Sequence, residues 1–300
     1  MSQFQRWVTP KKEVRIEQGV NGSMIEYEEF STDIDVIGPL LYTLLYDNWE
    51  QVQIGHIVQG SVLELEFTEA PKVFTLYDGY LTVATKGWHI HLCIEDHWGG
   101  PHCRTPDDLR ERRKLSRAAF YRRLNAQGKP RTWGIQFWNG AGEQMMTLFL
   151  PNPYLGEDDN LLPENKAKLE KLSLYQELRE IYVTGEKPIP FTENPLKRPY
   201  LAVCRSTRCN GSKDWQATFE ALKEAVAETD LDLRVQTAGC LQVCKMGPVV
   251  FNSENRQWFT RVTPEVGKCL VQSLAGAEDD LTKHHYPSPN NSQPESNACH

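Results

Sequence analysis

Hydrophobic positions in the last third of the chain follow two different periods. Residues 200–204 (YLAVC) form a short apolar run that predicts a buried strand. A helix is predicted next, because apolar residues recur at helical spacing after Ser212, a good N-cap residue. These residues are Trp215, Phe219, Leu222 and Val226. Alternation over 231–237, short strands at 248–251 and 257–262, and a helix over 264–274 complete a β-α-β-β-β-α order. This order predicts an α/β unit.

The first two thirds of the chain have a different pattern. Residues 31–50 and 164–183 have the apolar spacing of amphipathic helices, and residues 108–124 predict a third helix after the N-cap at Thr105. The predicted strands lie at 51–60, 61–67, 72–77, 82–94, 133–138 and 144–150, the last two around an NGAG turn. Hairpins covered by helices predict an α+β unit with an antiparallel sheet.

Three parts of the chain follow from these patterns. Residues 1–198 form the α+β domain, and residues 199–276 form the α/β domain. The boundary lies in EKPIPFTENPLKRPY, which has four prolines and no periodic pattern. Residues 277–300 are polar and rich in Pro, Asn and Ser, and we expect them to be a disordered tail.

Composition excludes some classes of protein. No window approaches the roughly 18 consecutive apolar residues of a membrane span. The N-terminus lacks the apolar region of a secretory signal, so we expect a cytoplasmic protein. The net charge of −7 gives no reason to expect a nucleic acid partner. The oligomeric state does not follow from the sequence.

Four of the eight cysteines form two short pairs near the C-terminus. Cys204 and Cys209 follow the first predicted strand of the α/β domain, and Cys240 and Cys244 follow the second. Loops that leave neighbouring strands at one edge can bring four thiolates together, the donor set of an iron–sulfur cluster. The C-x4-C and C-x3-C spacings are wider than the knuckle typical of structural zinc. A zinc site or a disulfide staple is the alternative.

The segments VCRSTRCNGS and AGCLQVCKMGPVVF resemble the thioredoxin-like [2Fe-2S] ferredoxin family. They are also similar to the small [2Fe-2S] subunit of NADH dehydrogenases, although residues 1–198 replace the helical extension of that subunit. The resemblance implies a thioredoxin-like fold and a one-electron carrier. It also implies that Cys204, Cys209, Cys240 and Cys244 bind the cluster, with electron donor and acceptor proteins as partners.

A second group of potential ligands lies in the first domain. His89, His91 and Cys93 share one face of a predicted strand, and His97, His102 and Cys103 follow within ten residues. Three interpretations are open. The group could bind a divalent metal, or one histidine could be the axial ligand of a heme. Alternatively, the histidines are hydrogen-bonded or solvated on a polar sheet face.

Basic residues crowd the predicted helix over 108–124. This pattern is typical of a solvated helix face, or of a site for an anion such as a propionate or phosphate or for an acidic partner. The stretches WHIHLCIEDHW, WGIQFWNGAGEQMMTLFL and KLSLYQELREIY loosely resemble a repeat of bacterial heme-trafficking proteins. That resemblance implies a heme site in the first domain.

Three classes of function follow. The first is a [2Fe-2S] one-electron carrier fused to a dedicated acceptor or docking domain. The second is an iron or redox sensor. The third is a heme- or metal-binding protein whose N-terminal domain is the functional site. Whether the chain is an enzyme is not decided by these motifs.

Overall fold

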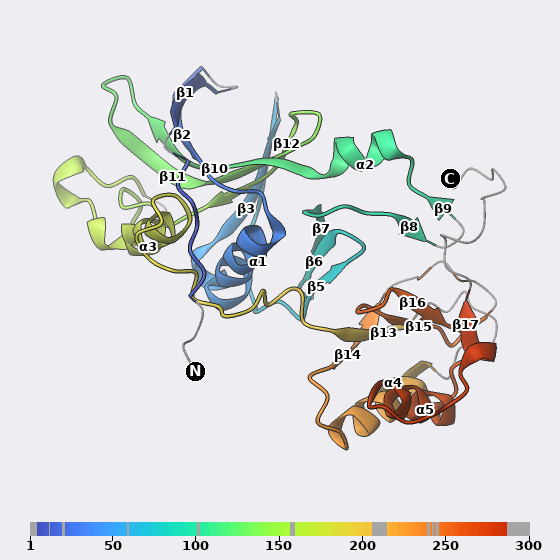
Figure 1. The fold of residues 1–300 in the computed structure, drawn as a ribbon. Coiled ribbons are helices and arrows are strands. Elements are labelled where there is room, and N and C mark those ends of the chain that lie inside the picture. The colour runs from blue at the N-terminus through green and yellow to red at the C-terminus, as the bar shows by residue number, and fades with distance from the viewer. Residues whose placement is uncertain are drawn as a thin grey trace. The chain divides into compact units, whose positions relative to one another are not determined.

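A computed structural model describes residues 5–11, 13–19, 22–58, 60–100, 103–156, 160–205, 215–238, 241, 243 and 246–286 (Figure 1). Contacts between Cα atoms divide the chain into two compact units. The first unit comprises Met1–His97 and Asp107–Leu196, and the second comprises Trp98–Pro106 and Lys197–His300. The sequence placed one boundary at residue 198, and that division stays a prediction. None of the helices in the described ranges has the length and apolarity needed to cross a membrane.

A seven-stranded sheet forms the centre of the first unit, and every neighbouring pair in it is antiparallel. The strands, in spatial order, are β1 (Val14–Gln18), β2 (Met24–Glu29), β10 (Leu115–Leu124), β11 (Pro130–Asn139), β12 (Gln144–Phe149), β3 (Gln53–Val58) and β4 (Ser61–Leu65). The predicted antiparallel sheet is therefore present, with β1 and β2 as strands that the sequence pattern did not predict.

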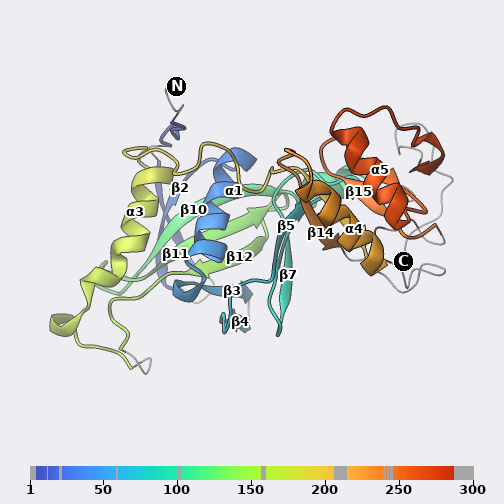
Figure 2. The same ribbon diagram turned by 90° about the horizontal axis from the view of Figure 1, so that it is seen from below.

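Two helices cover one face of this sheet (Figure 2). They are α1 (Ile34–Tyr42), which continues into a π-helical turn (Thr43–Asp47), and α3 (Ser173–Tyr182), which follows two 3-10 turns (Glu164–Lys166 and Leu169–Leu172). The Asp33 carboxylate caps α1 by accepting a hydrogen bond from the Asp35 N–H at 2.7 Å. Leu40, Leu44 and Tyr182 are fully buried between the helices and the sheet. This layer is the main hydrophobic core of the unit.

The opposite face of the sheet has a smaller aromatic cluster, whose members include Tyr27, Tyr121 and Trp138. Glycine makes room for these rings. A Cβ at Gly134 would lie 2.6 Å from Cε1 of Tyr121, and a Cβ at Gly55 would lie 2.2 Å from Cε2 of Phe149. The two glycines therefore let aromatic side chains lie flat across neighbouring strands.

The predicted helix over 108–124 is wrong beyond its first turns. Helix α2 (Asp107–Arg113) is short, and β10 follows it as a central strand. Both faces of β10 are buried, because Phe120 packs in the helix-covered core and Tyr121 packs in the aromatic cluster. A strand buried on both faces loses the apolar–polar alternation that identifies a strand in sequence.

A second antiparallel sheet of the first unit contains the strands β5 (Val73–Tyr77), β6 (Tyr80–Ala84) and β7 (His89–Cys93). A 3-10 turn (Trp49–Gln51) precedes β3. The short hairpin of β8 (Gly99–Gly100) and β9 (Cys103–Arg104) is assigned to the second unit.

The second unit has a five-stranded mixed sheet in the order β14-β13-β15-β16-β17. Its elements along the chain are β13 (Tyr200–Cys204), α4 (Trp215–Ala227), β14 (Arg234–Ala238), β15 (Val250–Asn252), β16 (Gln257–Phe259), α5 (Pro264–Leu274), a 3-10 turn (Thr282–His284) and β17 (His285–Tyr286). Strand β13 runs parallel to β14 and antiparallel to β15. The predicted β-α-β-β-β-α order is present.

The chain continues as ordered structure past Gly276. Strand β17 pairs with β16, Leu281 is buried in the hydrophobic core, and His284 Nδ1 lies 2.9 Å from the carbonyl oxygen of Thr260. The sequence placed the start of a disordered tail at 277, whereas Leu281 belongs to the core and His285–Tyr286 belong to the sheet. A single leucine and a two-residue strand are too short to give a periodic signal in a polar segment.

Candidate functional site

Cys204 is the last residue of β13, and its register partner on the parallel strand β14 is Ala238. Cys204 is a free cysteine and is almost completely buried. Its backbone N–H donates to the carbonyl oxygen of Val249 at 2.9 Å, and the next N–H, of Arg205, donates to Ala238 at 3.1 Å. The loops after β13 and β14 therefore leave the sheet at the same edge.

In the second cysteine-bearing loop, residues 239–247, the structure describes residues 241, 243, 246 and 247. Leu241 and Val243 are buried, at 2% and 1% exposure. Beyond them, the carbonyl oxygen of Met246 accepts a hydrogen bond from the backbone of Arg261 at 2.8 Å. Leu241 and Val243 both lie between Cys240 and Cys244 in the sequence.

Cys209, Cys240 and Cys244 lie outside the described residues, so the four-thiolate arrangement stays a prediction. The donor set still fits a cluster. Cys204 is a buried thiol without a disulfide partner at the strand edge from which both loops leave. Cys240 follows Ala238, the partner of Cys204, by two residues. Four soft thiolates in two separated pairs are the ligands that a [2Fe-2S] group takes.

His89 and His91 lie side by side on β7, with ring centroids 5.2 Å apart. Both side chains are exposed. His91 Nδ1 lies 2.8 Å from Oγ1 of Thr82, its register partner on β6. Partial burial and, second, the charge of His89 lower the pKa of His91 below its ordinary value. The two imidazoles stand on an open sheet face.

Cys93 and His97 form a separate, buried pair. Cys93 Sγ lies 3.4 Å from Nδ1 of His97, and the Tyr80 ring lies 5.1 Å from the imidazole. Burial raises the pKa of Cys93 to about 11 and lowers the pKa of His97. A thiol with so high a pKa is not a nucleophile at neutral pH. The pair is a neutral, packed element of the first unit.

The six residues singled out in this region thus do not converge in the described part of the chain. His102 lies outside the described residues, as does the side chain of Cys103. Within the described ranges, His, Cys, Asp and Glu side chains nowhere gather in a group of three or more that could hold a metal ion. A metal or heme site at the histidines stays a prediction.

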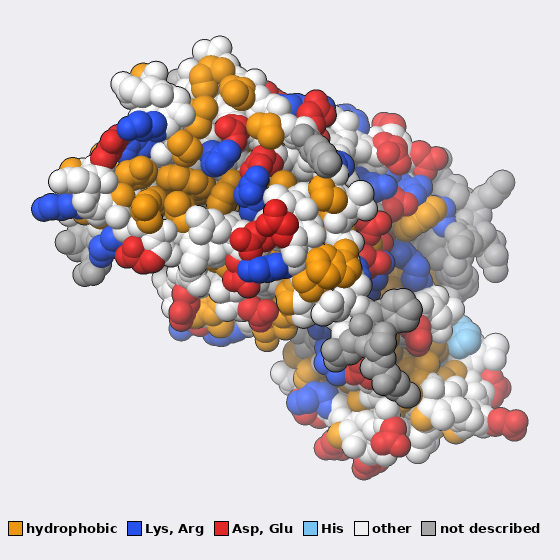
Figure 3. Space-filling view, turned by 60° about the vertical axis from the view of Figure 1, so that its left-hand side comes forward, with side chains coloured by type: hydrophobic (Ala, Val, Ile, Leu, Met, Phe, Trp, Pro, Cys, Tyr) orange, Lys and Arg blue, Asp and Glu red, His pale blue; other side chains and the backbone are white. Residues whose placement is uncertain are grey.

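The sequence patterns missed a cavity of about 1000 Å³ on the aromatic face of the seven-stranded sheet. Residues from β1, β2, β10, β11, β12, β3 and β4 line it, and they include Tyr27, His56, Arg123, Gln136, Trp138 and Phe149. Hydrophobic side chains gather on the surface seen in Figure 3, with acidic and basic side chains among them. A signal in the sequence was the predicted strand WGIQFW, in which the period of two places Gln136 and Trp138 on one face.

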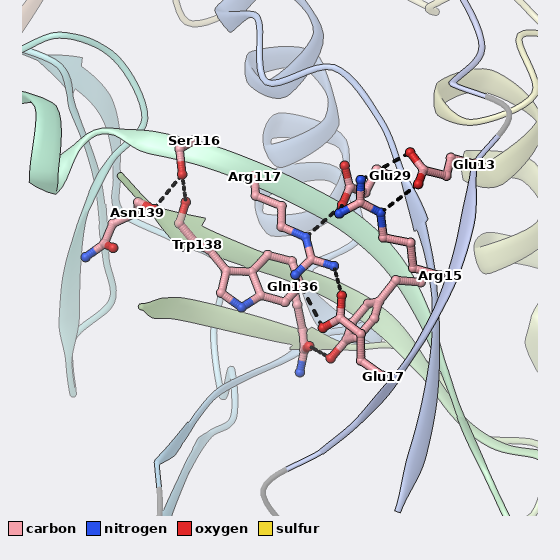
Figure 4. A network of polar contacts seen from close by, with 10 residues as sticks. Glu13, Arg15, Glu17, Glu29, Ser116, Arg117, Gln136, Trp138 and Asn139 are labelled. Carbon is pink, nitrogen blue, oxygen red and sulfur yellow. Dashed lines mark hydrogen bonds and ion pairs between the residues drawn. The ribbon is translucent and has the colours of Figure 1, made fainter. Parts of the chain in front are cut away.

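Ion pairs and hydrogen bonds order the side chains around this cavity (Figure 4). Arg117 lies over the Trp138 ring at 4.2 Å and pairs with Glu17 at 2.8 Å and with Glu29 at 2.9 Å. The Tyr27 hydroxyl donates to Gln136 Oε1 at 2.7 Å, and burial raises the pKa of Tyr27 to about 12. Tyr27 therefore stays protonated at neutral pH.

The chain belongs to a family of unknown function (DUF7676), whose model matches residues 14–184. This range lies within residues 1–198, the proposed N-terminal domain. The comparison with curated proteins gives no match.

Among solved structures, the chain is similar to the wild-type thioredoxin-like [2Fe-2S] ferredoxin from Aquifex aeolicus. The identity is 22%, the TM-score is 0.27, and the match covers 30% of this chain and 98% of the ferredoxin. A protein from Erwinia carotovora gives 19% identity and a TM-score of 0.32 over 51% of this chain and 76% of its own. For ChuX, the identity is 19% and the TM-score is 0.29, and the match covers 47% of this chain and 74% of ChuX. At these values the likenesses assign neither activity nor cofactor to this chain.

Proposed function

We propose that the protein is a one-electron carrier whose C-terminal unit holds a [2Fe-2S] cluster through Cys204, Cys209, Cys240 and Cys244. The observation that supports the proposal is the parallel pairing of β13 with β14, because both cysteine-bearing loops then begin at the same edge of the sheet. The cluster would supply transfer of one electron, which a donor protein loses and an acceptor protein gains.

The residues of this unit have ligation and shielding as their roles. Cys204 is buried at the strand end, and Leu241 and Val243 are buried within the second loop. Burial of apolar side chains around the thiolates would exclude water from the cluster and tune its reduction potential. The proposal needs no acid, base or nucleophile in this unit.

The N-terminal unit is, in this proposal, the acceptor or docking domain that selects the partner of the carrier in the cytoplasm. Its family has no established function, and its sheet carries a cavity large enough for a small molecule. The proposal therefore assigns binding to this unit and electron transfer to the other.

An iron or redox sensor is the second candidate, and it uses the same four cysteines. It differs in that the state of the cluster would change how the N-terminal unit binds its partner. A third candidate, heme or metal binding by the N-terminal unit, has the closeness of His89 to His91 in its favour. Adding heme or a divalent metal to the protein tests it through an absorbance or thermal shift.

Analysis of the full chain purified without oxygen tests the leading proposal. We expect two irons and two acid-labile sulfides per chain, visible absorption, and a rhombic paramagnetic signal after one-electron reduction. Zinc without sulfide would overturn the proposal. A sensor is distinguished by partner affinity that differs among the oxidised, reduced and cluster-free protein.

A further inference from the structure

Arg123 is a cation without a counterion in the cavity of the first unit. No hydrogen bond or ion pair joins its guanidinium to another side chain of the described residues, and its Nε is buried without an acceptor. Arg117 lies six residues earlier on the same strand, and it is paired with Glu17 and Glu29. Arg122, the residue before Arg123, pairs with Glu26. The sheet therefore supplies acids for two arginines of β10 and leaves the third, Arg123, without one among the described residues.

The other polar groups of the cavity floor are already satisfied. The Tyr27 hydroxyl donates to Gln136, and Gln136 Nε2 donates to Thr147 Oγ1 at 3.1 Å. His56 Nε2 lies 2.8 Å from the carbonyl oxygen of Gln144. Because a buried donor without an acceptor is unfavourable, the Arg123 guanidinium is the group in this cavity that an anion would stabilise.

Two acids line the same cavity, and neither neutralises Arg123. Glu64 lies on β4 and is exposed. Neither of its carboxylate oxygens lies within 4.0 Å of a guanidinium nitrogen of Arg123, the limit for an ion pair. Glu143 is exposed in the turn between β11 and β12, where its carboxylate accepts a hydrogen bond from Asn139. A second hollow of about 580 Å³ also has Arg123, Glu64 and Phe149 in its wall. The guanidinium is therefore reachable from two hollows.

The remaining walls are apolar and aromatic. Ile25, Tyr27, Trp138, Met145 and Phe149 line the larger cavity. Flat rings on several sides favour a ligand with an apolar, planar body, and a single cation favours one anionic end. Arginine also presents two parallel N–H groups that match a carboxylate.

We propose that this cavity binds an amphipathic organic carboxylate, whose acid group pairs with Arg123 and whose planar apolar body packs against Trp138 and Phe149. This site is separate from the proposed cluster, so the two proposals can fail independently.

The test compares two probes that differ only at the polar end. Fluorescence titration of the full chain with 1-pyrenebutyrate and with 1-pyrenebutanol measures the preference for the carboxylate. We expect the wild type to bind the carboxylate about tenfold more tightly than the alcohol, since a charged hydrogen bond is worth about a factor of ten. Arg123→Met should remove that preference, whereas Arg123→Lys should keep part of it.

Arg112→Met is the matched control, because Arg112 is an exposed arginine of α2 that does not line the cavity. It should keep the wild-type preference, and iron content should be the same in all variants. Equal binding of the two probes by the wild type would overturn the proposal even if Arg123→Met did not fold. An unchanged preference in folded Arg123→Met would also overturn it.

Discussion

Cys204 and Ala238 are register partners at the ends of two parallel strands, and each stands at the start of a cysteine-bearing loop. Strand β13 reaches β14 through helix α4, a crossover that makes the two strand ends point the same way. The pairing supports a shared site for the two loops at one edge of the sheet.

Replacing Cys204 should therefore remove the cluster. We expect Cys204→Ser to lose most of the iron, sulfide and visible absorption, because a hydroxyl is a poor ligand for iron in place of a thiolate. Cys269→Ser is the control, since Cys269 lies on α5, away from either pair in sequence, and packs against the core. Full cluster content in Cys204→Ser, measured by iron and sulfide analysis, would contradict the assignment of that ligand.

The stability of the first unit should depend on Arg179. Its guanidinium donates to both carboxylate oxygens of Glu28 at 2.6 and 2.7 Å, and the Glu28 side chain is only 8% exposed. Arg179→Met leaves that carboxylate buried without a partner. We expect the free energy of unfolding, measured in urea, to fall by about 2–3 kcal/mol. This loss is smaller than the full cost of breaking a buried ion pair because Arg179 is partly exposed.

A double variant separates the charge from the packing. Adding Glu28→Gln to Arg179→Met should recover part of the lost stability, since a neutral amide is less costly to bury than an unpaired carboxylate. If the double variant is less stable than Arg179→Met, the buried charge is not the cause of the loss.

Acid should destabilise the first unit through His97. Burial lowers the pKa of His97 below its usual 6.5, so the folded protein keeps this imidazole neutral at a pH where the unfolded chain protonates it. The unfolded state then binds more protons, and the free energy of unfolding falls as the pH drops from 7 to 5. We expect His97→Gln to lose less stability than the wild type over this range in urea unfolding.

The exposed His89 provides the comparison for that pH dependence. His89→Gln removes an exposed imidazole whose charge is the second cause of the lowered pKa of His91, so we expect it to flatten the pH profile by less than His97→Gln does. A flatter profile for His89→Gln than for His97→Gln would show that the burial of His97 is not the source.

Gly134 should tolerate no side chain. A Cβ there would lie 2.2 Å from the carbonyl oxygen of Leu148 and 2.6 Å from the Tyr121 ring. We expect Gly134→Ala to cost about 1–3 kcal/mol in thermal or urea unfolding. Gly87→Ala, where a Cβ meets no atom within 4 Å, should change stability by less than about 0.5 kcal/mol. Equal effects of the two substitutions would contradict the close packing of β10, β11 and β12.

The sequence alone determined the order of elements in the C-terminal unit, the pairs of cysteines and the antiparallel character of the N-terminal sheet. These features depend on local signals, such as the helical spacing of Trp215 and Leu222 or the N-cap at Thr263, whose side chain accepts a hydrogen bond from the Val266 N–H. Such signals can be read from the sequence because capping and periodicity depend on residues only a few positions apart.

Only the tertiary structure decided that residues 115–124 are a strand and that His89 and His91 are exposed whereas Cys93 and His97 are buried. It also decided that Arg123 has no counterion within the part of the chain that the structure describes. Each of these depends on neighbours distant in the chain. Tyr121 is buried by its partner Tyr27, almost a hundred residues earlier, and Arg117 is neutralised by Glu17. Side-chain pairing across a sheet is set by strand order and register, which no local pattern in the sequence specifies.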